Sequence, residues 1–357
     1  MAASARAARL VYFEQWVHPI AGEMLAENLN IQVVHINPRD EPARIEAALA
    51  DADGCQSLTR TDATLSGTGE RWLGNAPFIA LCPKMLAIFT AGAGYDVIDV
   101  QACTRAGILV CNQSGVSLEA VAEHALGFML ALSKKISIAD RVIRRTPDWS
   151  RTDFMGNDLL GKTLGIVGFG HIARRLVELV QPLRMKILAC DPFLSADQMA
   201  ASGAEKAELM ELLRRSDFVS AHAPLTDETR AMFGRAQFAA MKPGAFFLTT
   251  ARGGVHDEDA LVEALGSGHL GGAGVDVYHK EPPPPGHPLF RFDNVVATPH
   301  SAGVTFETTR DIAVATAKLW STLFAGEAPS RVINPEAWPH FADRFTTRFG
   351  FRPKEPC

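Results

Sequence analysis

The chain lacks the features that mark membrane proteins and nucleic-acid-binding proteins. Its 357 residues contain no stretch of about eighteen uninterrupted apolar residues, the length that a transmembrane helix needs. The 35 lysines and arginines are scattered and are outnumbered by 40 aspartates and glutamates. A formal net charge of −5 gives no attraction to nucleic acid or to an anionic membrane. We therefore expect small-molecule partners, and neither nucleic acid nor a membrane.

Cysteine is scarce and shows no pattern. The six cysteines, at positions 55, 82, 103, 111, 190 and 357, form no C-x-x-C pair and have no histidine spacing typical of a zinc site. We expect reduced, mostly buried thiols, a cytoplasmic location and no metal site. The first nine residues are rich in alanine but lack the apolar stretch of a signal peptide, and we interpret them as a flexible start. A short mitochondrial presequence is the alternative.

The most informative segment is Gly165–Ala173, which places a G-x-G-x-x-A turn after an apolar strand and before a helix. Gly168 permits a tight turn, Gly170 lets the backbone approach a pyrophosphate, and Ala173 lets the helix pack closely on the strand. The phosphates would then lie at a helix N-terminus. We interpret this segment as a dinucleotide-binding turn rather than an ordinary βαβ crossover.

An acidic residue follows the glycines at the spacing typical of NAD-binding proteins. The apolar run Lys186–Cys190 ends at Asp191, about twenty positions beyond the glycines. There a carboxylate can bond the two adenine-ribose hydroxyls, and it would repel a 2′-phosphate. The sequence therefore predicts NAD in preference to NADP.

The order of apolar runs predicts two α/β domains, as the length also suggests. A small unit alternates strands and helices over residues 8–111, and a long apolar helix follows at Leu118–Lys135. After the loop at residues 144–158 and the glycine turn, strands and helices alternate to residue 297, which indicates a doubly wound parallel sheet. A last helix over 305–324 is expected to return to the first domain. The nucleotide domain is thus predicted to be inserted into another domain.

Four polar residues each follow a predicted strand or its loop, and together they suit an oxidoreductase: Arg252, Asp276, Glu281 and His300. Hydride transfer from a C2–OH group needs a base for the hydroxyl proton, and histidine suits this role. Glu281 can orient the ring of His300 and stabilise its charged form. Arg252 can clamp a carboxylate in bidentate fashion, and Asp276 can hold the nicotinamide carboxamide. Taken singly, each could be an ordinary capping, loop or core residue; their joint order favours the functional interpretation.

The chain resembles the D-isomer-specific 2-hydroxyacid dehydrogenases from about residue 50 to 325. Six segments match that family's pattern in order: Val121-Ala122-Glu123-His124, Gly165 to Ala173, Ala221-His222-Ala223-Pro224-Leu225-Thr226, Thr250-Ala251-Arg252-Gly253-Gly254, Gly274-Val275-Asp276-Val277 and Thr298-Pro299-His300-Ser301-Ala302-Gly303. The resemblance implies an α/β fold in which a Rossmann-type doubly wound sheet is inserted into a smaller flavodoxin-like substrate domain. The implied domains are residues 1–112 and 305–340 for substrate, 113–304 for NAD, and a tail at 341–357.

The resemblance also implies the site residues. Arg252, Glu281 and His300 would be the catalytic set. The substrate would contact Gly92, Ala93, Gly94, Arg252 and His300. NAD would contact Gly168, Gly170, His171, Ile172, Asp191, Ala223, Thr250, Ala251, Arg252, Asp276, His300 and Gly303. A homodimer built around the Leu118–Lys135 helix is also implied.

Two departures narrow the activity. Formate dehydrogenases of the family have glutamine at the position of Glu281, so formate oxidation is not expected. Phosphoglycerate dehydrogenases often place arginine at the position of Thr90, although Arg60 is a second candidate for binding a phosphate. We predict an NAD-dependent 2-hydroxyacid dehydrogenase with His300 as acid and base. The alternatives are a 3-phosphoglycerate dehydrogenase and a non-enzymatic NAD-sensing module related to transcriptional corepressors.

Overall fold

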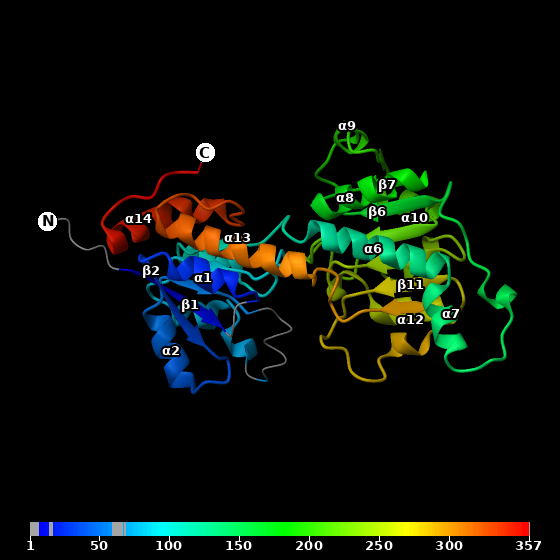
Figure 1. The fold of residues 1–357 in the computed structure, drawn as a ribbon. Helices are drawn as coiled ribbons and strands as arrows, with labels where there is room; N and C mark the ends of the chain where they lie inside the picture. Colours follow the sequence, from blue (N-terminus) through cyan, green and yellow to red (C-terminus); the bar gives the residue numbers. More distant parts are fainter. Residues whose placement is uncertain (1–6, 14–16, 59–66, 68, 357) are drawn as a thin grey trace. The chain divides into compact units, whose positions relative to one another are not determined.

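The chain folds into two compact units (Figure 1). The structure is a computed structural model that describes residues 7–13, 17–58, 67 and 69–356. Unit 1 comprises Met1–Ser117 and Thr305–Cys357, and unit 2 comprises Leu118–Val304. The sequence placed the first boundary after residue 112, whereas here it follows residue 117. The predicted flexible start, up to residue 6, and Arg60 lie outside the described residues.

Unit 1 contains a five-stranded parallel sheet in the order β2-β1-β3-β4-β5. This is the flavodoxin-like order 2-1-3-4-5. The strands are β1 (Ala8–Phe13), β2 (Ile31–Ile36), β3 (Gly54–Gln56), β4 (Ala87–Phe89) and β5 (Leu109–Cys111). The helices are α1 (Ile20–Ala26), α2 (Pro42–Ala50), α4 (Ala76–Ala80), α5 (Val100–Arg105), α13 (Phe306–Phe324) and α14 (Trp338–Phe349).

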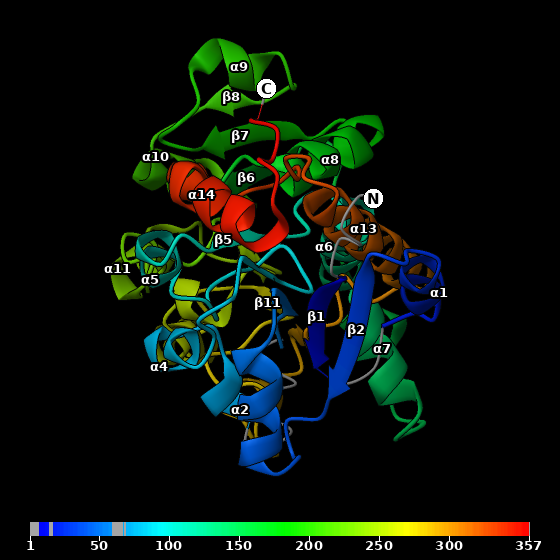
Figure 2. The same cartoon turned by 90° about the vertical axis from the view of Figure 1, so that its left-hand side faces the viewer.

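Alternate residues of the unit 1 strands face opposite layers of helices. On β1, Leu10 packs in the cluster formed with α1, α13 and α14, whereas Val11 packs in the cluster formed with α2, α4 and α5. Trp320 of α13 stacks on Phe89 with ring centroids 3.8 Å apart. Figures 1 and 2 show α1 and α13 on one side of the sheet and α2 on the other. The unit is therefore a three-layer α/β/α fold.

The predicted tail, from residue 341, contains most of a packed helix. Helix α14 extends to Phe349, and its residues Phe341 and Phe345 are fully buried in unit 1. The Arg348 guanidinium forms a two-pronged ion pair with Asp53, whose side chain is inaccessible to solvent. This ion pair holds α14 against the sheet of unit 1.

Unit 2 contains a seven-stranded parallel sheet in the order β12-β11-β10-β9-β6-β7-β8. The strands are β6 (Thr163–Val167), β7 (Lys186–Cys190), β8 (Glu205–Lys206), β9 (Phe218–Ala221), β10 (Phe246–Thr249), β11 (Gly272–Val275) and β12 (Val295–Ala297). Counted within the unit, this is the Rossmann order 3-2-1-4-5-6 with one further strand. The order in which strands are added to the sheet reverses between β6 and β9. A Rossmann sheet binds its ligand at this point. The predicted two-domain α/β fold is confirmed.

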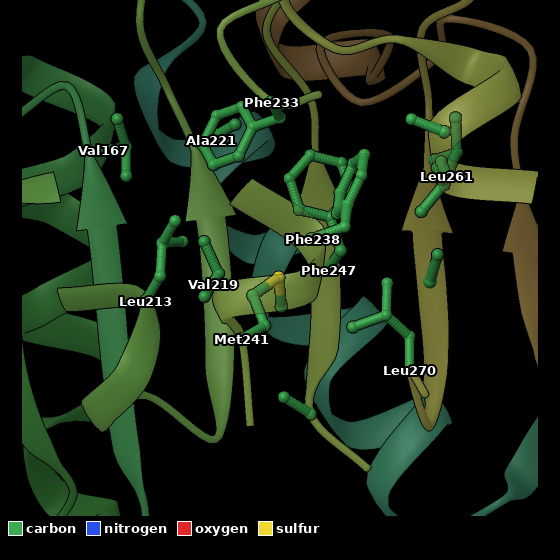
Figure 3. Packing of buried hydrophobic residues seen from close by; sticks show 14 of the residues in the cluster. Val167, Leu213, Val219, Ala221, Phe233, Phe238, Met241, Phe247, Leu261 and Leu270 are labelled. Atoms are coloured by element: carbon green, nitrogen blue, oxygen red, sulfur yellow. The ribbon is translucent and has the colours of Figure 1, made fainter. Parts of the chain in front are cut away.

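Helices cover both faces of the unit 2 sheet. The helices are α6 (Leu118–Ser133), α7 (Ile136–Ile143), α8 (His171–Val180), α9 (Ala196–Ala200), α10 (Leu209–Arg215), α11 (Arg235–Ala240) and α12 (Glu258–Gly266). One face packs against α6 and α8, and the other against α10, α11 and α12. Figure 3 shows the second face, where Phe238 of α11 packs with Phe233 and with Phe247 of strand β10. The ring centroids of Phe238 and Phe247 are 5.1 Å apart and the rings meet edge to face.

Two general expectations can be compared with the described part of the chain. None of its helices is both long enough and apolar enough to cross a membrane. Its five cysteines are free thiols, and all but Cys190 are buried. Burial raises the pKa of Cys82 and of Cys103 to about 12, so these thiols stay protonated and behave as small apolar groups.

Candidate active site and dinucleotide-binding turn

The glycine turn has the geometry that the sequence predicted. Gly168 directly follows β6 and has φ +86°, a left-handed conformation that favours glycine. A Cβ atom at this position would lie 2.6 Å from the backbone nitrogen of Ala223, which follows β9. The turn is therefore closed against the neighbouring strand end, and side chains are excluded from it at this point.

Gly170 serves a different purpose. It is the N-cap of α8, has φ −82°, and a Cβ here would meet no atom within 4 Å. No side chain caps the first turn of this ten-residue helix, whose residues His171 and Ile172 are exposed and half-buried. Ala173 is fully buried against the sheet, which confirms its packing role. Space next to uncapped N–H groups at a helix N-terminus fits a phosphate of a dinucleotide.

Asp191 lies directly beside the turn. Its Oδ2 accepts a hydrogen bond of 2.9 Å from the N–H of Phe169, and its Oδ1 accepts one of 2.9 Å from the N–H of Phe193. The carboxylate is thus fixed at the end of β7, next to the glycines. This position at the end of the second strand is where a dinucleotide fold places its ribose-binding carboxylate, and the bond from Phe169 ties Asp191 to the turn itself.

Arg252 follows β10 and is linked to the next strand loop. Its Nη1 donates a 2.7 Å hydrogen bond to the carbonyl of Ala251. A Cβ on the adjacent Gly253 would lie 1.9 Å from the carbonyl oxygen of Tyr278, so glycine is needed for the two segments to touch. The hydroxyl of Thr250 is buried and has no hydrogen-bond partner among the described residues. An unpartnered polar atom at a strand end fits a site that takes a ligand.

Glu281 and His300 form a hydrogen-bonded pair. The His300 Nδ1 lies 2.7 Å from Glu281 Oε2, and the side chains are 36% and 10% exposed. Glu281 is itself fixed, because its Oε1 accepts a 3.0 Å bond from the N–H of Tyr278. A carboxylate on Nδ1 leaves Nε2 as the nitrogen that can take or give a proton. The exposed fraction of His300 keeps its ring accessible.

Asp276 is buried beneath His300. Its side chain is 0% exposed, and its oxygens accept hydrogen bonds from the Thr298 hydroxyl at 2.6 Å and from the N–H groups of Ser301 at 2.8 Å and Ala302 at 3.0 Å. Its backbone carbonyl accepts a 2.7 Å bond from the N–H of His300. The predicted contact with a nicotinamide carboxamide stays a prediction; in the structure this residue organises the turn of residues 298–302, which continues to Gly303.

In unit 1, the predicted substrate loop follows β4. The carbonyl of Gly92 accepts bonds from the Thr90 hydroxyl at 2.7 Å and the N–H of Gln113 at 2.9 Å. The carbonyl of Ala93 accepts a 2.7 Å bond from the side chain of Asn112. These hydrogen bonds to residues 112 and 113 hold the backbone of the loop from Thr90 to Gly94 in place. The side chain of Thr90 is buried and brings no charge to the loop.

Sequence reasoning assigned no role to two residues that the structure places around Asp276. His124 of α6 lies 3.0 Å from the hydroxyl of Thr298, and Tyr278 donates a 3.1 Å bond to the carbonyl of Thr298. His124 ends a segment that matches the family pattern and Tyr278 directly follows another, but their partners are 174 and 20 positions away in the chain. The family resemblance was therefore a signal for these positions, but it did not name their partners.

The comparisons with known proteins show the family of the chain. Residues 126–302 match the family model described as D-isomer specific 2-hydroxyacid dehydrogenase, NAD binding domain. The D-3-phosphoglycerate dehydrogenase of Archaeoglobus fulgidus is 41% identical over 233 residues, which cover 65% of this chain and 44% of the relative. The glyoxylate reductase of Aeropyrum pernix is 35% identical over 335 residues, which cover 91% of this chain and 96% of the relative.

A solved structure extends the likeness to both units. The D-lactate dehydrogenase from Aquifex aeolicus, complexed with NAD and lactic acid, aligns with a TM-score of 0.75 and 27% identity over 89% of this chain and 96% of that chain. The chain belongs to the D-isomer specific 2-hydroxyacid dehydrogenase family, and its central domain is of the NAD-binding type. It spans about half the length of the phosphoglycerate dehydrogenases that it matches.

Proposed function

We propose that the protein is an NAD-dependent 2-hydroxyacid dehydrogenase that also reduces 2-keto acids. The observation that carries the proposal is the pair of Glu281 and His300, whose atoms Oε2 and Nδ1 are 2.7 Å apart in the same unit as the glycine turn. A base that is accessible and oriented by a carboxylate is what removal of a hydroxyl proton requires. Family membership supports the same chemistry.

The residues have distinct roles in the oxidation of a 2-hydroxy acid. Arg252 binds the substrate carboxylate through its forked N–H donors, and His300 takes the hydroxyl proton at Nε2. Glu281 stabilises the charged ring that results. Within unit 1, the family resemblance assigns substrate binding to backbone N–H groups of the segment from Gly92 to Gly94. Bound NAD supplies the acceptor for the hydride that leaves C2.

The cofactor would be held by the residues around the glycine turn. The open space at Gly170 and the uncapped start of α8 fit the pyrophosphate, and Asp191 fits the ribose hydroxyls. Thr250, with its unpartnered buried hydroxyl, fits a polar contact to the nucleotide. The remaining contacts that the family resemblance implies, from His171 to Gly303, belong to the same proposal.

The position of Thr90 favours substrates without a phosphate. Its hydroxyl is engaged with the carbonyl of Gly92, so it offers neither a charge nor a free donor there. We therefore propose a small 2-keto acid and its 2-hydroxy counterpart in preference to phosphohydroxypyruvate. A homodimer built around α6 is part of the proposal and is tested by sedimentation equilibrium.

The decisive experiment is a turnover assay with NADH and a panel of 2-keto acids. The panel contains glyoxylate, hydroxypyruvate, phosphohydroxypyruvate and bulkier keto acids. The variant His300→Ala should lower turnover on the best substrate by about 10²- to 10⁴-fold, because proton transfer is lost. NADH binding, measured by fluorescence, should persist in this variant because the glycine turn is intact.

Two results would contradict the proposal. Near-normal turnover in His300→Ala would remove His300 from the role of base. Tight NADH binding by the wild-type protein without turnover of any acid in the panel would favour a cofactor-sensing module. Arg252→Lys keeps the charge but loses the fork, and it should raise KM steeply; an unchanged KM would mean that the substrate carboxylate is held elsewhere.

A further inference from the structure

His124 lies on α6 in contact with the turn that carries His300. Its Nε2 is 3.0 Å from the hydroxyl oxygen of Thr298 and 4.0 Å from Asp276 Oδ1. Its ring meets Phe128 edge to face, with centroids 4.6 Å apart, and the side chain is 24% exposed. The ring is thus held on two sides, by an aromatic neighbour on its own helix and by a polar contact to the turn.

The directions of the hydrogen bonds follow from the donors available. The Thr298 hydroxyl has a single proton, and it donates this proton to Asp276 Oδ1 over 2.6 Å. Its oxygen must therefore accept from His124, which requires a proton on Nε2. Burial lowers the pKa of His124, an effect that Asp276 opposes, so the ring is neutral in the physiological range and Nδ1 carries no proton. The chain of bonds runs from His124 to Thr298 to Asp276.

Asp276 connects this chain of hydrogen bonds to the turn that carries His300. Its carboxylate also accepts from the N–H groups of Ser301 and Ala302, and its carbonyl accepts from the N–H of His300. His300 has φ +55°, which is unfavourable for a residue with a Cβ and persists only where surrounding bonds enforce it. The hydrogen bonds to Asp276 are those bonds, and the Thr298 hydroxyl donates one further bond to the same carboxylate.

We propose that His124 is a positioning residue for the reaction, and that it acts through Thr298 and Asp276 on the backbone of His300. This inference rests on the proposed function for its kinetic consequences, but not for its structural ones. His124 directs the Thr298 proton toward Asp276, and the filled carboxylate holds the turn in the conformation that brings His300 to Glu281. Without His124 the hydroxyl can rotate away, and the turn gains freedom.

The test compares His124→Leu with His124→Gln, whose amide can still donate to Thr298. In His124→Leu, kcat should fall by about 10- to 100-fold because His300 is misplaced. KM should change by less than about twofold, because no substrate contact is removed. His124→Gln should recover kcat to within about threefold of wild type, since the donor is restored.

A double-variant cycle tests the path. Thr298→Val removes the hydroxyl, and the combination of His124→Leu with Thr298→Val should lose no more activity than Thr298→Val alone. His269→Leu is the matched control. His269 is half-buried in the same unit, and its Nε2 lies 3.0 Å from the backbone carbonyl of Phe238. Additive losses, or an equal loss of kcat in His269→Leu, would overturn the proposal.

Hydrogen exchange supplies a measurement that does not depend on activity. The amides of residues 300–302 should exchange about 10-fold faster in His124→Leu than in the wild type, and should be protected again in His124→Gln. Unchanged exchange at these amides would reject the role of His124, whatever the kinetics. If the wild-type protein turned over no acid, the proposed function would fail while this measurement would still decide the proposal.

Discussion

Two residues of the candidate site occupy backbone conformations that an L-amino acid rarely takes. Gly168 has φ +86°, and His300 has φ +55°. At Gly168 the absence of a Cβ removes the cost, and at His300 the hydrogen bonds to Asp276 offset it. At one tight turn the strain is therefore avoided because glycine has no side chain, and at the other it is offset by hydrogen bonds.

A pair of substitutions distinguishes the roles of the two glycines in the turn. Gly168→Ala should destabilise the protein by about 2 kcal/mol or more, because it combines a left-handed conformation with a backbone clash. Gly170→Ala should leave the free energy of unfolding within about 1 kcal/mol of wild type, since the space is open and φ is ordinary. Urea denaturation measures both.

Gly170→Ala should nevertheless weaken NADH binding, because its methyl group occupies the space proposed for the pyrophosphate. Fluorescence titration measures this effect. Unaltered affinity in a stable Gly170→Ala protein would mean that the phosphates lie elsewhere. The pair thus distinguishes a glycine needed for folding from one needed for binding.

The elements of the two sheets were predicted with differing success, and the difference has a physical cause. The apolar run Lys186–Cys190 has the bounds of strand β7, and the helix expected over Leu118–Lys135 is α6, which ends at Ser133, because apolar patterns of this kind are local. Helix α14 was predicted only in part, because the residues from 341 onward were assigned to a tail. Its apolar residues Phe341, Phe345 and Phe349 follow helical spacing and bury against unit 1.

The anchor of α14 can be tested at its ion pair. Arg348→Met removes the ion-pair partner of Asp53, whose carboxylate is 0% exposed and, among the described residues, keeps a 2.8 Å bond from the N–H of Arg9. We expect a loss of about 3 kcal/mol in the free energy of unfolding, because a buried charge loses its counterion. Arg352→Met is the control.

Arg352 forms a pair with Asp343 at 2.8 Å, but the two side chains are 54% and 71% exposed. Its substitution should cost less than about 1 kcal/mol. Chemical denaturation of both variants under the same conditions gives the comparison. Equal losses would show that α14 is held by its apolar face alone.

At the scale of the whole molecule, two buried histidines of unit 2 make the free energy of unfolding sensitive to acid. Burial lowers the pKa of His222 and that of His256 to about 4. Both belong to unit 2, and the ring nitrogens of His256 have no partner among the described residues. The unfolded chain binds protons at these positions first, with a usual pKa of 6.5, so stability is present above that pH and is lost as the pH falls toward 4.

The variant His256→Leu lacks one of the two histidines that bind a proton more readily in the unfolded chain than in the folded protein. Between pH 7 and 4.5 the wild type should lose about 2–3 kcal/mol more stability than His256→Leu, as the difference between the two pKa values requires. Urea denaturation at both pH values measures it, with the exposed His171→Leu as control. An equal loss in wild type and His256→Leu would mean that His256 is charged in the folded protein.

The sequence by itself determined what depends on short-range pattern. Apolar runs set the strands, the glycines and Ala173 marked the turn, and the order of Arg252, Glu281 and His300 indicated the chemistry, because strand ends and turn residues are local properties. Only the tertiary structure decided the partners. That Glu281 bonds Nδ1 of His300, that Asp276 is buried under the turn, and that His124 reaches Thr298 from 174 positions away depend on packing between distant segments. Periodicity says which face of an element is buried, but the neighbour that a polar atom meets there is set by the assembled core.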